Sequence, residues 1–176
     1  MARQIHLLSA LLRPRQPVPG MGLLDTSTTT MRVRPADLDL YLHVNNGTYL
    51  QMMDVARTHL IADLGGFPLL RAKGWYPVVA AQTVTYRRSL KLGQRFEIAT
   101  RVVGWDERVI YLEQVFTSAG RHCARGLVAG RFLARGTGER VPAPQVVALL
   151  GPGVGSPEMP DDVAAWARSV DVAHRT

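Results

Sequence analysis

Asp37-Leu-Asp-Leu-Tyr-Leu-His-Val-Asn-Asn-Gly47 concentrates reactive side chains within this chain of 176 residues. The stretch holds two carboxylates, one imidazole and two carboxamides, and a helical pattern follows it directly. Asn45 or Asn46 can cap the first turn of that helix, and Gly65-Gly66 can end it. Apolar residues then recur at the spacing of one helix face, which predicts a helix over residues 47–64: Tyr49, Met53, Ala56, Leu60 and Leu64.

The segments on both sides of this helix carry strand patterns. One strand is predicted before it, at residues 28–34, and a short Pro-led turn at residues 67–74 follows it. Four further strands are predicted at residues 78–89, 95–104, 108–117 and 121–134. Trp105-Asp-Glu and Ser118-Ala-Gly are short enough to be hairpin connections. One long helix with a run of antiparallel strands predicts an α+β fold, in which a curled sheet wraps the helix.

Domain limits follow from changes in composition along the chain. Residues 1–24 contain no acidic residue and are predicted to be a flexible N-terminal extension outside the fold; an organellar presequence is the alternative. Residues 25–150 form the predicted domain, and residues 151–176 a linker followed by a C-terminal helix. That last helix is predicted to begin at Pro160 and to pack on the domain through Val163, Trp166, Ala167 and Val170.

Composition excludes several classes of protein. Hydrophobic residues make up 47% of the chain and charged residues 20%, which is typical of a globular domain, and no apolar run approaches the length of a membrane span. Cys123 is the sole cysteine, so neither an intrachain disulfide nor a thiolate zinc site can form, and we expect no metal and a cytoplasmic location. The net charge of +7 comes from arginine, since only Lys73 and Lys91 are lysine. Without a basic motif interleaved with aromatics, this charge favours phosphate on a small ligand over nucleic acid.

The stretch before the helix has two interpretations. The first-turn amides and the dipole of a helix favour developing negative charge, so a polarised carbonyl and a nearby carboxylate could carry out hydrolysis there. Alternatively, Asp and Asn before a helix are ordinary caps, and His43 is a surface residue. Two other candidates are assigned structural roles: Cys123 to the core, and Asp54 with Arg57 to a surface ion pair.

A family resemblance favours the catalytic interpretation. Residues 34–50, followed by Met53-Asp-Val-Ala-Arg57, resemble the signature of hotdog-fold acyl-CoA thioesterases of the 4-hydroxybenzoyl-CoA thioesterase type. The chain is most similar to the branch called thioesterase superfamily member six, over roughly residues 30–170. Three further segments carry that similarity: Tyr86-Arg-Arg-Ser-Leu, Val103-Gly-Trp-Asp-Glu-Arg and Pro157-Glu-Met-Pro-Asp-Asp-Val.

The resemblance implies a fold and a set of site residues. The fold is a hotdog: a long central helix wrapped by an antiparallel sheet of five or six strands, paired as a dimer or a dimer of dimers. The implied catalytic carboxylate, acting as nucleophile or base, is Asp39, while Asp37 is assigned to loop structure. The other implied catalytic residues are His43, Asn45, Asn46 and Gly47, of which the last two contribute backbone amides. Two residues depart from the family. Related plant enzymes have Asn where this chain has Tyr41, and many family members have Gly where it has Leu42.

The predicted activity is hydrolysis of an acyl-CoA, or a related acyl thioester, to free acid and thiol, within fatty acid metabolism. Coenzyme A enters as part of the substrate, and no other cofactor is expected. The predicted substrate-binding residues are Tyr41, Tyr49, Arg87, Arg88, Arg121 and Arg125. Two alternatives stay open: a non-catalytic acyl-CoA binder acting as a sensor or scaffold, and a hotdog hydratase.

Overall fold

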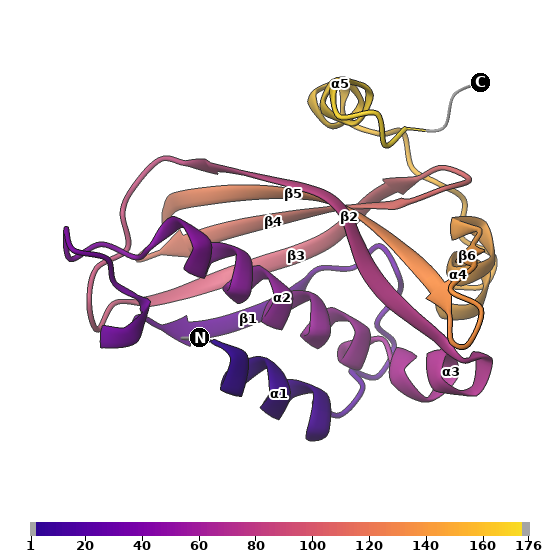
Figure 1. Cartoon of the computed structure of the whole chain (residues 1–176), viewed down its shortest axis with the longest axis horizontal. Helices are drawn as coiled ribbons and strands as arrows, with labels where there is room; N and C mark the ends of the chain where they lie inside the picture. The colour runs from indigo at the N-terminus through magenta and orange to yellow at the C-terminus, as the bar shows by residue number, and fades with distance from the viewer. Residues whose placement is uncertain (1–2, 174–176) are drawn as a thin grey trace.

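The computed structural model describes residues 3–173 and shows one long helix held against a six-stranded antiparallel sheet (Figure 1). The α+β prediction is therefore confirmed. The strands are β1 Ser27–Arg32, β2 Trp75–Tyr86, β3 Arg95–Trp105, β4 Ile110–Ser118, β5 Arg121–Ala134 and β6 Arg140–Val141. The α-helices are α1 Gln4–Leu12, α2 Asn46–Asp63, α3 Gly66–Lys73, α4 Ala143–Leu150 and α5 Asp161–Ser169; a single 3-10 turn, η1, spans Pro35–Asp37.

The strand order places sequence neighbours in the middle of the sheet and distant strands at its edges. The order is β1-β3-β4-β5-β2, with β6 paired to β5, and every pairing is antiparallel. Register shifts interrupt β2 between Val79 and Ala81 and β3 between Val102 and Gly104. Such irregularities bend strands and increase their twist, which suits a sheet that curls around α2.

The central helix forms as its sequence pattern predicts. Asn45 caps it, because its side-chain oxygen accepts a hydrogen bond from the Gly47 amide at 2.8 Å. Gly65, just beyond its end, has a φ of 66°, a left-handed conformation that glycine adopts without steric penalty. The face that carries Tyr49, Met53 and Ala56 is buried against the sheet. Gly126 of β5 leaves room for this contact, since a Cβ there would overlap Met53 Cε.

α5 packs on the domain, as the sequence predicts, and it does so on the face of the sheet opposite α2 (Figure 1). Val163 and Ala167 are 1% and 0% exposed and pack with Tyr111, Leu127 and other residues of the sheet. The prediction that Val170 packs there is wrong. Val170 is 42% exposed because the helix ends at Ser169 and this residue already lies in the following turn.

The N-terminal segment differs from its prediction. Residues 3–24, expected to lie outside the fold as a flexible extension, instead form α1, which packs beside α2 (Figure 1), and a connection that buries Leu23. Arg3 and Ala10 are 1% and 6% exposed, and both lie against the body of the domain. Residues 1–2 and 174–176 of the predicted extension and tail lie outside the described residues. The segment is held there by the packing of Leu7 and Ala10 on the core and by a buried ion pair, described below.

Three short elements were not predicted. The segment expected to be a Pro-led turn is the helix α3, because proline is tolerated in a first turn and Gly74, with a φ of 66°, ends the helix. Residues 140–150, for which no element was predicted, form β6 and α4, which close the end of the sheet beside α3 (Figure 1). Within residues 3–173, no helix is both long enough and apolar enough to span a membrane.

Candidate functional site

The loop between β1 and α2 begins with a buried part around Asp37, which we call the base of the loop. Asp37 is 0% exposed, and its two carboxylate oxygens bind the Arg3 guanidinium at 2.9 Å from Nε and 2.5 Å from Nη2. The same carboxylate accepts a hydrogen bond from the Arg34 amide at 2.7 Å, and the Asp37 carbonyl accepts one from the Asn45 amide at 2.8 Å. Asp37 therefore joins the N-terminal segment, the start of the loop and the cap of α2.

The tip of the same loop carries Asp39 and is open to solvent. One carboxylate oxygen, Oδ1, accepts hydrogen bonds from the amides of Tyr41 at 2.9 Å and His43 at 3.3 Å. The Asp39 amide in turn donates to the His43 carbonyl at 2.9 Å, so the tip is a closed turn. Leu42 lies inside this turn with a φ of 60°, the left-handed region that favours glycine. That backbone conformation gives a physical reason for the glycine that many family members carry at this position.

The start of α2 brings the predicted helix amides next to this tip. Asn45, Asn46 and Gly47 are exposed, as is His43, whose backbone pairs with Lys91. The Gly47 amide, expected to polarise a carbonyl, is already bonded to the Asn45 side chain. The positive end of the helix dipole still faces the loop.

The predicted tyrosines occupy different environments. Tyr41 is 82% exposed at the loop tip, whereas Tyr49 is 2% exposed in the core, where its hydroxyl accepts a hydrogen bond from the Leu90 amide at 3.4 Å. Tyr49 contacts Tyr86 edge to face, and the Tyr86 hydroxyl donates to the Asn46 carbonyl at 3.3 Å. Tyr86, which was not predicted as a site residue, thus links the end of β2 to the start of α2.

The predicted arginines separate into two groups. Arg87 and Arg88 are exposed beyond the end of β2, where both backbone amides donate to the Cys123 carbonyl, and Arg121 is exposed at the nearby start of β5. This group lies at the same end of the sheet as the Asp39 loop. Arg125 is different, because it is ion-paired with Glu113 of β4 and Asp162 of α5. Its guanidinium fastens α5 to the sheet.

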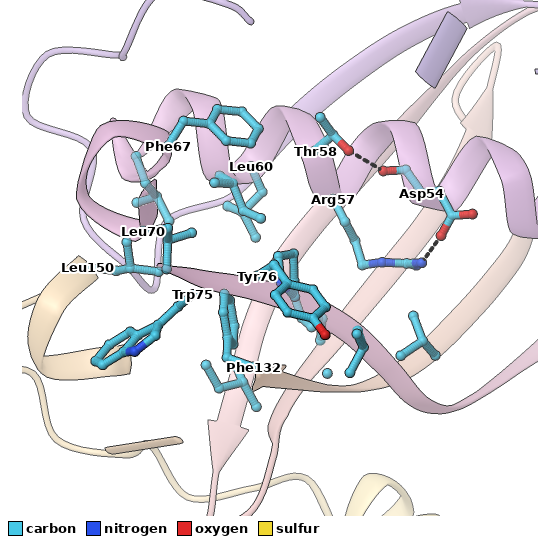
Figure 2. A pocket seen from close by; sticks show the side chains of 18 of the residues that line it. Asp54, Arg57, Thr58, Leu60, Phe67, Leu70, Trp75, Tyr76, Phe132 and Leu150 are labelled. Carbon is cyan, nitrogen blue, oxygen red and sulfur yellow. Dashed lines mark hydrogen bonds and ion pairs between the residues drawn. The ribbon is translucent and has the colours of Figure 1, made fainter. Parts of the chain in front are cut away.

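A large cavity lies at the other end of α2 (Figure 2). Its volume is about 680 Å³, and it is lined by the second half of α2, α3, the first half of β2, the sheet beneath them, and Leu7 and Leu11 of α1. The walls are mainly apolar, and Leu60, Phe67, Leu70, Trp75, Phe132 and Leu150 are labelled in Figure 2. Volumes and linings of this kind are typical of sites for small organic ligands.

Asp54 and Arg57 place a charged pair on this apolar wall (Figure 2). Arg57 is ion-paired with Asp54, and its Nη1 donates to Gln114 Oε1 at 2.8 Å. The Arg57 side chain is 13% exposed, so the prediction of a surface ion pair is wrong for this residue. Burial raises the pKa of the Asp54 carboxyl above its usual value, although the Arg57 guanidinium acts in the opposite direction. A carboxyl with these properties on a cavity wall is a candidate functional group.

The sequence carries a signal that Arg57 lies partly in the core. Arg57 lies four residues after Met53 and three before Leu60, so it shares a helix face with two buried residues. Met53-Asp-Val-Ala-Arg57 was also part of the family signature. The structure therefore contains two polar regions on one helix: the Asp39 loop at its start and the Asp54–Arg57 pair at the cavity, about 12 Å further along by helical rise.

Comparisons with known proteins agree with this architecture. Residues 33–167 match the family model described as "Thioesterase-like superfamily". "Protein THEM6" of Danio rerio is 36% identical over 143 residues, covering 81% of this chain and 69% of that protein. "Long-chain acyl-CoA thioesterase FadM" of Escherichia coli strain K12 is 30% identical over 89 residues, covering 51% of this chain and 67% of that protein.

A solved structure gives the same result for the fold. The crystal structure of YbaW, a probable thioesterase from Escherichia coli, superposes with a TM-score of 0.65 at 25% sequence identity, covering 69% of this chain and 93% of that one. The predicted hotdog arrangement of helix and sheet is thereby confirmed. Because the family model spans well over half of the sequence, the chain belongs to the thioesterase-like superfamily.

Proposed function

We propose that this protein hydrolyses an acyl-CoA or a related acyl thioester to a free acid and a thiol. The single observation that carries the proposal is the apolar cavity of about 680 Å³ beside α2, which suits an acyl chain. The family membership and the name of the Escherichia coli relative support the same chemistry.

In the proposed reaction, Asp39 supplies the carboxylate. Its Oδ1 is held by two loop amides, which leaves Oδ2 to accept a proton from water while that water adds to the thioester carbonyl. The positive end of α2 stabilises the resulting oxyanion. The C–S bond then breaks, and the leaving thiolate takes the proton from Asp39, which returns to its carboxylate form. Arg87, Arg88 and Arg121, exposed at this end of the sheet, are the proposed contacts for the phosphates of coenzyme A. Arg125 is left out of this set because two carboxylates already hold it.

We further propose that a second copy of the chain completes the site. The Asp39 loop and the cavity lie toward opposite ends of α2 in one protomer. The loop tip exposes Leu40, Tyr41 and Leu42, and the free edge β2 exposes Val79 at 41%. Apolar groups on an unpaired edge favour association, and a homodimer through β2 would cover them.

Thiol release from acyl-CoAs of increasing chain length, measured beside direct binding, tests the proposal. We expect turnover, and we expect Gly130→Val to shift the preference toward shorter chains. Gly130 lines the cavity, and a Cβ there would meet Leu112 at 3.6 Å, an ordinary contact distance. We therefore expect the valine to be accommodated in the strand and to occupy space that a long acyl chain would fill. Short acyl-CoAs are the internal control, because their turnover should not change. Binding without turnover at any chain length would contradict hydrolysis and support an acyl-CoA binder.

A further inference from the structure

Helix α1 exposes an apolar face that the fold leaves uncovered. Ile5, Leu8 and Leu12 recur at the spacing of one helix face and are 82%, 55% and 72% exposed. The helix carries no charged residue, and its other side packs on α2 through Ala10. Exposed apolar side chains gathered on one face indicate an interaction surface.

The charge around α1 indicates the chemistry of the partner. The first acidic residue of the chain is Asp25, while Arg13 is exposed directly after α1. Arg32 and Arg34 are exposed near the start of the helix, where Arg3 binds the Arg32 carbonyl and the Asp37 carboxylate. An apolar helix face flanked by arginines at both ends is complementary to a surface that combines anionic headgroups with an apolar interior.

A second copy of the chain does not account for this face. The proposed dimer uses the free edge β2, whereas the connection that follows α1 contacts the opposite edge, where Arg15 Nη1 donates to the Thr28 carbonyl of β1 at 3.1 Å. Figure 1 likewise shows α1 beside β1 and α2. A dimer through β2 would leave Ile5, Leu8 and Leu12 open.

We infer that α1 binds the surface of an anionic lipid bilayer. In this arrangement Ile5, Leu8 and Leu12 enter the headgroup region and Arg13 contacts lipid phosphates. Leu7 and Leu11 of the same helix line the large cavity, so membrane binding would bring this side of the cavity to the lipid. This last step rests on the proposed function, since it gives long acyl chains a path between bilayer and cavity. The binding of α1 to the bilayer does not depend on the proposed function.

Sedimentation of the full chain with vesicles tests the inference. Phosphatidylcholine vesicles with phosphatidylglycerol should sediment the protein, those without it should do so much less, and added salt should weaken binding. The double variant Ile5→Ser/Leu12→Ser should lose roughly tenfold or more in lipid affinity, because two large side chains no longer leave water. Arg13→Gln should lose about fivefold. Val170→Ser is the matched control, since Val170 is 42% exposed in the turn after α5, on the opposite face of the sheet, and its loss should change nothing.

Three results would overturn the inference: no binding to either vesicle, double-variant binding equal to the parent, or a halved mass of the double variant by light scattering. The last result would show that the face joins two copies of the chain. Thiol release from a soluble short-chain acyl-CoA, measured without vesicles, separates the two proposals. Its absence would count against the proposed hydrolysis and leave the membrane contact standing.

Discussion

The base and the tip of the loop before α2 differ in burial and in charge pairing, although only one residue, Leu38, separates their aspartates. At the base, Asp37 is fully buried and its charge is neutralised by Arg3, so it stabilises structure. At the tip, Asp39 is partly exposed, and only Oδ1 is held by the loop's own amides. The difference teaches that burial alone gives the two carboxylates of one short motif different properties. A buried, paired carboxylate is fixed, whereas one at an open tip can reach a substrate.

The largest expected effect comes from Asp39→Asn. We expect turnover to fall by roughly 10²–10⁴-fold, the usual effect of removing a positioned acid–base group. The free energy of unfolding should hardly change, because the asparagine oxygen can still accept both loop hydrogen bonds. Asp37→Asn should reverse this pattern. It leaves the Arg3 guanidinium buried without a counter-charge, which should cost about 3–5 kcal/mol of stability.

Thiol-release kinetics and urea unfolding of the two variants, run side by side, check this exchange of roles. The control is Asp25→Asn, since Asp25 is exposed and bonds only with the nearby Gly22 amide in the part of the chain that the structure describes. Equal losses of turnover in the Asp37 and Asp39 variants, measured where both are folded, would remove the distinction between base and tip.

A second prediction concerns pH and the contact between α1 and α2, which lies beside the base of the loop. His59 of α2 bonds to Thr29 at 2.9 Å and lies beside His6 of α1, Arg15 and Asp63. Burial lowers the pKa of His59 from 6.5 to about 4, with smaller contributions from Arg15 and His6. Between these values the unfolded chain binds a proton that the folded chain does not. The free energy of unfolding should therefore fall by about 2–3 kcal/mol as the pH drops from 6.5 to 4.

Urea unfolding at intervals across this pH range measures the effect, and His59→Asn isolates it. Asparagine keeps a hydrogen-bonding group toward Thr29 but does not titrate. The free energy of unfolding of this variant should therefore depend less on pH than that of the parent. Parallel curves for the two proteins would show that His59 plays no part in the acid sensitivity of the α1–α2 contact.

The smallest effect is expected at the tip, from Leu42→Gly. Leucine at a φ of 60° costs about 1–2 kcal/mol, which glycine relieves, while the added freedom of the unfolded chain takes back about 0.4–1 kcal/mol. We expect a net gain in the free energy of unfolding of under about 1 kcal/mol. Leu40→Gly is the matched control: Leu40 is 99% exposed with a negative φ, so glycine there should only destabilise. Equal losses of unfolding free energy in the two variants would mean that the backbone of the tip is unstrained.

Much of the fold could be predicted because its long elements carry local signals. α2 combines a periodic apolar face with Asn45 and Gly65 at its ends, and β5 begins and ends at the predicted residues. α1 could not be predicted, because no charge or cap marks it and its stability comes from tertiary contact. The Arg3–Asp37 pair joins residues that are 34 apart in sequence.

The candidate site was predicted less completely than the fold. The loop motif indicated Asp39 and its neighbours, and these assignments stay predictions. The cavity was not foreseen, because its walls come from distant segments whose residues are ordinary core types, such as Leu60, Trp75 and Phe132. Arg57 shows the same limit: spacing on a helix reveals its neighbour Asp54, but not Gln114 on the sheet beneath.

The strand order also has a consequence for folding kinetics. β3, β4 and β5 form two consecutive hairpins whose contacts close short loops, whereas β1 pairs Ser27 with Thr100 and β2 pairs Trp75 with Ala134. Long loops cost more entropy to close and must close before their contacts stabilise anything. We therefore expect the three central strands to assemble first and both edges late, so that the chain folds on a timescale of milliseconds to seconds. Until that last step, the partly folded chain exposes the sheet surface that α2 later covers, which makes this interval the one in which aggregation competes with folding.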